Sequence, residues 1–147
     1  MLAVLLVVLG ASGAQAQESA DTLQSARDRH LQRIRAEIRG RESQPAGDVY
    51  RNLQILRDLP ASRLLAIMDI GFGRSLGVTC EHCHDTGAFH LDVKKPKLIA
   101  RAMWTMMGRI NSELLGSIPE LEGRSPTVNC TTCHRGQVTP ALNLPER

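Results

Sequence analysis

The stretch TCEHCHD, from Thr79 to Asp85, determines how this chain folds, because nearly the same pattern returns as NCTTCHRG, from Asn129 to Gly136. All four cysteines of the 147-residue chain lie in these two copies of Cys-x-x-Cys-His. A short chain that places every cysteine in one repeated pattern indicates a chemistry that needs the cysteines in pairs, each pair followed by a histidine.

Three chemistries use paired cysteines. Four cysteines can form two disulfides in an exported protein, and two Cys-x-x-Cys pairs can supply the four thiolates of a zinc site. Neither requires a histidine directly after each second cysteine. Covalent haem does, because the two thiols form thioether bonds to the haem vinyl groups and the next histidine binds the iron. The pattern therefore predicts two haem c groups, attached through Cys80, Cys83, Cys130 and Cys133, with His84 and His134 as axial ligands.

The second axial position of each iron can be filled by methionine, by another histidine, or left open. Met68 and Met103 each lie in an apolar, helix-like segment that precedes a cysteine motif. Methionine most often serves as core filler, so this observation alone leaves the role of both residues open. Gly71 and Ala100 lie three positions from Met68 and Met103, on the same helix faces, where small residues would let a flat ring approach.

Composition agrees with a protein whose centre is filled by a cofactor. Aromatic residues make up only 3% of the chain, although a core of this size usually depends on aromatic bulk. The formal charge of +3 is too small, and its basic residues too dispersed, to indicate nucleic-acid binding. Exposed lysines at Lys94, Lys95 and Lys97 are expected to form either a docking patch for an acidic redox partner or an ordinary solvated loop.

The N-terminal stretch MLAVLLVVLGASGAQA, residues 1–16, has no charged residue and ends in the Ala-x-Ala pattern of signal-peptide cleavage. Its apolar run is too short to span a bilayer. No basic residue precedes that run, so an uncleaved anchor is the alternative. The expected location is the periplasm.

The pattern of the whole chain predicts an all-α protein with much loop, since no segment shows sustained strand-like alternation. We expect a signal peptide at 1–16, a charged helix and linker at 17–47, and a dihaem domain at 48–147. Helices are predicted at 19–42, at 49–56, from Pro60 to about Leu76, and from Pro96 to Gly116. The last two each lead through a loop to a cysteine motif, so the domain consists of two helix–loop–Cys-x-x-Cys-His units.

Between Asp48 and Gln137 the chain resembles the cytochrome c subunit of photosynthetic reaction centres. The resemblance rests on VYRNLQILRDLP, SRLLAIM, LGVTCEHCH, IARAMWTM, RIN and VNCTTCHRGQ. It implies that Met68 pairs with His84 on the first haem and Met103 with His134 on the second. Met106 matches a family methionine that is not a ligand, and it is the alternative to Met103. The full subunit carries four haems, whereas this chain has motifs for two.

Histidine and methionine on both irons would leave no position for a substrate, which favours a one-electron carrier over an enzyme. The expected partners are redox proteins, within a membrane-associated electron-transfer complex or free of one. The alternatives are a peroxidase-like dihaem enzyme and a haem-based sensor, both of which need an open iron site.

Overall fold

The computed structural model describes residues 11–121 and 126–143, with side chains from Ser19 onward. Within these ranges the chain is helical with much loop, and its only β contact is an isolated bridge between Pro45 and Pro60. The predicted all-α class is confirmed. None of the helices in the described part is long and apolar enough to cross a membrane. Residues 1–10 of the predicted signal peptide lie outside the described residues, so export stays a prediction.

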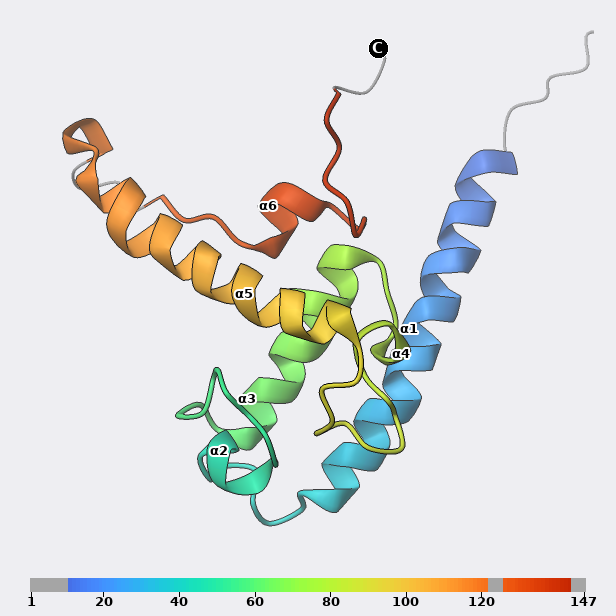
Figure 1. The fold of residues 1–147 in the computed structure, drawn as a ribbon. Coiled ribbons are helices and arrows are strands. Elements are labelled where there is room, and N and C mark those ends of the chain that lie inside the picture. The colour runs from blue at the N-terminus through green and yellow to red at the C-terminus, as the bar shows by residue number, and fades with distance from the viewer. Residues whose placement is uncertain (1–10, 122–125, 144–147) are drawn as a thin grey trace, which may run out of the picture.

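The charged N-terminal segment forms the longest helix, α1 (Ala11–Glu37), which lies along one side of the molecule beside the first cysteine motif (Figure 1). An apolar stripe on α1 is buried at Leu31 and Ile38 and half-buried at Ile34. The helix ends earlier than position 42, and a turn follows in which Gly40 has a positive φ of 81°. The stripe is therefore the face by which α1 packs on the rest of the protein.

The small apolar core lies where α1 meets the helix that follows Pro60. Leu31, Ile38, Ala61 and Leu65 form one buried cluster, with Ile34, Val49 and Tyr50 packed against it. The hydroxyl of Tyr50 donates a hydrogen bond to the Ala61 carbonyl at 3.1 Å. This cluster fixes α1 at one end of the fold, away from the second cysteine motif.

The helix predicted at 49–56 is wrong. The structure has instead a single turn, α2 (Ala46–Val49), followed by irregular chain in which Asn52 and Leu56 have positive φ values of 56° and 62°. The Asn52 side chain donates to the carbonyl of His90, 38 residues away. Contacts with a distant loop thus take precedence over the helical periodicity of this segment.

The predicted helix after Pro60 is present and changes its pitch along its length. It begins as α3 (Ala61–Ala66) and continues as a π-helix, η1 (Ile67–Arg74). Such wider turns are rare and often mark functional sites. The π-helix contains Met68, and the first cysteine motif follows directly as α4 (Cys80–Cys83).

The second predicted helix is also present. It comprises α5 (Lys95–Arg109), with proline in its first turn as expected, and a π-helical end, η2 (Ile110–Leu114). Two short 3₁₀ turns follow, η3 (Leu115–Ser117) and η4 (Pro119–Leu121), before the second cysteine motif forms α6 (Cys130–His134). In Figure 1, α5 crosses the rod made by α3 and η1, so the two helices that precede the motifs meet near the centre of the molecule.

Candidate haem-binding site

The first motif forms a one-turn helix, and this places Cys80 and Cys83 on the same side. Thr79 enters the turn in an extended conformation, and His84 leaves it in an extended conformation. The amide of His84 donates to the Cys80 carbonyl at 2.9 Å, which closes the turn. Residues three apart on a helix share a face, so both thiols can attach to one planar group.

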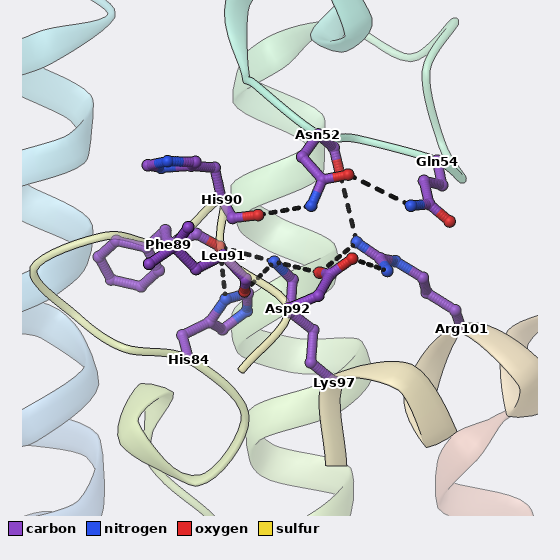
Figure 2. A network of polar contacts seen from close by, with 9 residues as sticks. All are labelled: Asn52, Gln54, His84, Phe89, His90, Leu91, Asp92, Lys97 and Arg101. Atoms are coloured by element: carbon purple, nitrogen blue, oxygen red, sulfur yellow. Dashed lines mark hydrogen bonds and ion pairs between the residues drawn. The ribbon is translucent and has the colours of Figure 1, made fainter. Parts of the chain in front are cut away.

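The ring of His84 is oriented by a hydrogen bond from its Nδ1 to the carbonyl oxygen of Phe89, at 3.1 Å (Figure 2). A carbonyl oxygen only accepts, so Nδ1 carries the proton and Nε2 keeps its lone pair. Burial lowers the pKa of His84, which favours the neutral ring that binds a metal. An imidazole held in this way through its other nitrogen is the usual arrangement of a metal-binding histidine.

The second motif repeats the arrangement with different supports. Asn129 and Thr132 cap α6 reciprocally, each side chain accepting a hydrogen bond from the other residue's backbone amide. The Nδ1 of His134 lies 3.0 Å from the carbonyl oxygen of Gln137, so Nε2 is again the nitrogen with the free lone pair. The side chain of Asn111 makes two hydrogen bonds with the backbone of Val128, at 2.8 and 2.9 Å. Asn111 therefore ties the end of the α5–η2 helix to the start of this motif, a role that the sequence pattern did not predict.

The arrangement of the four cysteines helps to distinguish disulfides, a zinc site and covalent haem. The cysteines form no disulfide with one another. Burial raises the pKa of Cys80, Cys83 and Cys130. Among the described residues, no group of three or more His, Cys, Asp and Glu side chains converges as a metal-ion site. Two separate pairs of thiols, each beside an oriented histidine, fit haem c better than a zinc site built from four thiolates.

The two motif regions touch each other directly through their backbones. A Cβ atom placed on Gly77, whose φ is 66°, would lie 2.1 Å from the Gly136 carbonyl oxygen. The Gly136 amide donates to the Ser75 carbonyl at 2.8 Å, and the hydroxyls of Ser75 and Thr131 lie 2.6 Å apart. Only glycine permits this approach at position 77, so the backbone itself fixes how the two motif regions are spaced.

The methionines expected to be ligands lie on the two crossing helices. Met68, in η1, and Met103, in α5, are both half-buried, whereas Met106 is 45% exposed. The rings of Phe72 and Trp104, whose centroids are 6.1 Å apart, join the two helices. The pairing of Met68 with His84 and of Met103 with His134 stays a prediction.

Helix α1 is anchored to the first unit by a buried arginine that sequence reasoning missed. The Arg27 guanidinium pairs with Asp69 of η1 at 3.0 Å and donates to the carbonyl of Val78, just before the first motif, at 2.9 Å. Its Cδ lies 2.7 Å from where a Cβ on Gly73 would be. Gly73, which lies inside the π-helix, therefore makes room for this arginine. The signal that could have revealed Arg27 is its place on the apolar stripe, four positions before Leu31.

A second contact joins α1 to the first motif itself. The ring of His30 pairs with the carboxylate of Glu81, which lies between the two cysteines. Hydrogen bonding, first from the Thr79 side chain and further from His30, lowers the pKa of Glu81 to about 2. The carboxylate is therefore charged at neutral pH, and α1 holds the motif at a residue adjacent to Cys80.

The expectation that Lys94, Lys95 and Lys97 are all exposed is wrong for Lys94 and Lys97. Lys95 is exposed, and the Lys94 ammonium lies half-buried against the carbonyl of Glu81. Lys97 is buried, because its ammonium lies under the loop that follows the first motif. A docking patch built from all three side chains is therefore excluded.

Comparison with known proteins assigns these features to a family. The family model described as photosynthetic reaction centre cytochrome C subunit matches residues 6–144. The chain belongs to this family. Membership makes it a c-type cytochrome, a class of protein whose cofactor is covalently bound haem c.

The relatives found are much longer than this chain. Cytochrome c-554 of Chloroflexus aurantiacus is 30% identical over 83 residues, covering 56% of this chain and 20% of that protein. The photosynthetic reaction center cytochrome c subunits of Thermochromatium tepidum and Roseobacter denitrificans are 30% and 32% identical over 96 and 102 residues. Each alignment covers 65% of this chain, but only 22% and 26% of those subunits. The matched segment therefore spans only about a quarter or less of the length of each relative.

Proposed function

We propose that this reaction centre cytochrome family member is a periplasmic one-electron carrier that holds two haem c groups. Cys80 and Cys83 would attach the first haem, and Cys130 and Cys133 the second. His84 with Met68 and His134 with Met103 would be the axial ligands. Haem c, when bound, supplies a one-electron iron couple, and the protein supplies the ligands and their surroundings.

The observation that carries the proposal is the matching orientation of the two motif histidines. Each donates from Nδ1 to a backbone carbonyl a few residues further along the chain, Phe89 for His84 and Gln137 for His134. Each ring therefore presents Nε2 as the metal-binding nitrogen, beside the two cysteines of its motif. Two units with the same donor set support two haems rather than one.

Closed iron sites distinguish a carrier from the alternatives. A half-buried methionine lies on each helix that precedes a motif, so each unit has a thioether available for the second axial position. A peroxidase-like enzyme or a gas sensor would need at least one iron with an open position. The expected partners are redox proteins, including those of a membrane-associated complex.

The test is the haem content and ligand binding of the exported protein. A pyridine haemochrome assay and the mass of the denatured protein should give two covalent haems per chain. Replacing Cys80 and Cys83 by alanine, or Cys130 and Cys133 by alanine, should leave one haem in each case. The reduced wild-type protein should not bind carbon monoxide. One haem in the wild type would overturn the dihaem proposal, and carbon monoxide binding would favour the enzyme or the sensor.

Periplasmic location rests on the uncharged N-terminal stretch and its Ala14–Ala16 cleavage pattern. Cell fractionation together with N-terminal sequencing tests it. The expected result is a periplasmic protein that begins at Gln17, and a cytoplasmic holoprotein would contradict it.

A further inference from the structure

Lys97 is a buried cation next to the proposed ligand of the first haem. It belongs to α5, yet its side chain is only 11% exposed. The ammonium donates to the carbonyls of Phe89 and Leu91, both at 2.8 Å, and pairs with Asp92 at 3.0 Å (Figure 2). All three partners lie in the loop after the first motif, so the lysine stabilises that loop from inside.

The carbonyl oxygen of Phe89 accepts two hydrogen bonds, one from Lys97 and one from Nδ1 of His84. A carbonyl oxygen has two lone pairs, so both bonds can exist together. The cation and the proposed iron ligand thus share one acceptor atom. Any change in the charge on that atom reaches the imidazole through a single hydrogen bond.

Asp92 offsets only part of the charge of Lys97. The same carboxylate also accepts two hydrogen bonds from Arg101, at 2.8 and 2.9 Å (Figure 2). Arg101 and then Lys97 hold the pKa of Asp92 well below its usual range, so the carboxylate is ionised. Two cations and one anion leave the group with a net charge of +1.

Two effects of this cation have the same sign. A cation bonded to the Phe89 carbonyl makes that oxygen a weaker acceptor for His84, which lowers the basicity of the imidazole as an iron ligand. The positive charge also disfavours the oxidised, more positive state of a haem held by His84. Both effects raise the reduction potential of that haem.

The second unit has no equivalent. The Gln137 carbonyl accepts from Nδ1 of His134, and among the described residues no lysine or arginine donates to it. The hydrogen bond between His134 and Gln137 is also exposed, whereas that between His84 and Phe89 is partly buried. The two histidines therefore have the same orientation but different electrostatic surroundings.

We propose that Lys97 is a positioning residue that raises the reduction potential of the haem held by His84, and so makes the two haems unequal. The proposal rests on the proposed function, since it requires haem at both motifs. Its consequence is a direction of electron flow within the chain, towards the first haem.

The experiment is a spectroscopic redox titration of the exported dihaem protein and its variants. Lys97→Met should lower the potential of one haem, so that its ratio of oxidised to reduced iron at fixed ambient potential rises about tenfold, or about 59 mV. Lys97→Gln keeps a donor without the charge and should give a smaller shift, and Lys97→Arg should restore the wild-type value. Lys95→Met, which removes an exposed charge from the same helix turn, is the matched control and should change neither haem.

Asp92→Asn separates an electrostatic role from a structural one. Removing the carboxylate leaves both cations in place, so the same haem should become easier to reduce. Loosening of the loop would move the potential in the same direction for Lys97→Met and Asp92→Asn. In proton spectra of the ferric protein, the Nδ1 proton of His84 should move in Lys97→Met, and that of His134 should not.

Equal potentials in Lys97→Met and Lys95→Met, or shifts of the same sign in Lys97→Met and Asp92→Asn, would overturn the inference. If Lys97→Met fails to load haem, Lys97→Gln and Asp92→Asn carry the test through their opposite signs. Haem content is measured on every sample. A wild type with fewer than two haems contradicts the proposed function, whereas two haems with unchanged potentials contradict the role of Lys97 alone.

Discussion

Met68 and Met103 are the side chains whose replacement tests the proposed ligand set most directly. Methionine bound to ferric haem gives a weak far-red absorption band, and each proposed ligand should contribute about half of it. Met68→Ala and Met103→Ala should therefore each remove about half of the band. Each variant should also let one reduced iron bind carbon monoxide.

Met106→Ala and Met107→Ala are the matched controls, since they shorten the same helix face by the same number of atoms. Both should leave the band intact. Loss of the band in Met106→Ala but not in Met103→Ala would move the second ligand by one turn. If neither Met68→Ala nor Met103→Ala alters the band, the closed iron sites are refuted.

Tyr50, the single tyrosine, reports on the core at the base of α1. Burial raises its pKa from 10.0 to about 12, because the phenolate would lose hydration. The folded state holds this proton more tightly than the unfolded state. The resulting stability is fully present below pH 10 and is lost as the pH rises through about 12.

An ultraviolet difference titration against Tyr50→Phe, which has the same haem absorption and no phenol, measures this value. A midpoint near 12 is expected in the folded protein. A midpoint near 10 would mean that the Tyr50 hydroxyl is in contact with water.

Single residues also show where sequence reasoning reaches its limit. The repeated Cys-x-x-Cys-His pattern predicts two haem sites because the spacing and the chemistry are both local, and these sites stay a prediction. Lys97 was predicted to be exposed, since a lysine in a charged stretch usually is. It is buried because the carbonyls of Phe89 and Leu91 need donors, and only the fold brings them to α5.

Among the helices, the docking of α1 depends on Arg27. Arg27→Ala would remove the shorter of the two arginine contacts of Asp69, leaving the exposed Arg74 at 3.3 Å, and would remove the hydrogen bond to Val78. The free energy of unfolding should fall by about 2 kcal/mol, because two hydrogen bonds of a buried charged group are lost while Asp69 keeps one cation. Urea unfolding of the exported protein measures the change.

Arg109→Ala is the control for that variant. Arg109 also pairs with a carboxylate, that of Glu113, but both side chains of this pair are exposed. Its effect should stay within about 0.5 kcal/mol. Equal effects of the two substitutions would show that α1 is not held through Arg27.

The helices also differ in how well they could be predicted. Those after Pro60 and Pro96 were predicted at their starts, because a proline there suits the first turn and an apolar periodicity follows. The helix predicted at 49–56 was wrong because Asn52, in the middle of that segment, makes hydrogen bonds with distant residues. Asn52 donates to the His90 carbonyl and accepts from Arg101 through its own carbonyl, and neither partner can be recognised from local sequence. The π-helix around Met68 was not predicted, because no residue pattern in this segment distinguishes a π-helix from an α-helix.

For the molecule as a whole, Gly77 is the position at which a single methyl group should do most damage. Gly77→Ala combines a positive φ with a Cβ that would lie 2.1 Å from the Gly136 carbonyl oxygen. We expect the free energy of unfolding to fall by about 3 kcal/mol or more, and the two haem spectra to change together.

Gly40→Ala serves as the control, since Gly40 also has a positive φ but no atom within 4 Å of the added Cβ. Backbone strain alone should cost about 1 kcal/mol there and leave the spectra unchanged. Similar results for the two variants would mean that the contact between the motif regions does not matter.

The backbone contact at Gly77 and Gly136 has a consequence for electron movement if both motifs carry haem. Side chains can change rotamer, but two main chains in direct contact cannot slide apart without breaking the hydrogen bond between Gly136 and Ser75. The distance between the two haems would then stay fixed. Electron transfer between them would proceed at a constant rate, and the overall rate would vary only with how each partner docks.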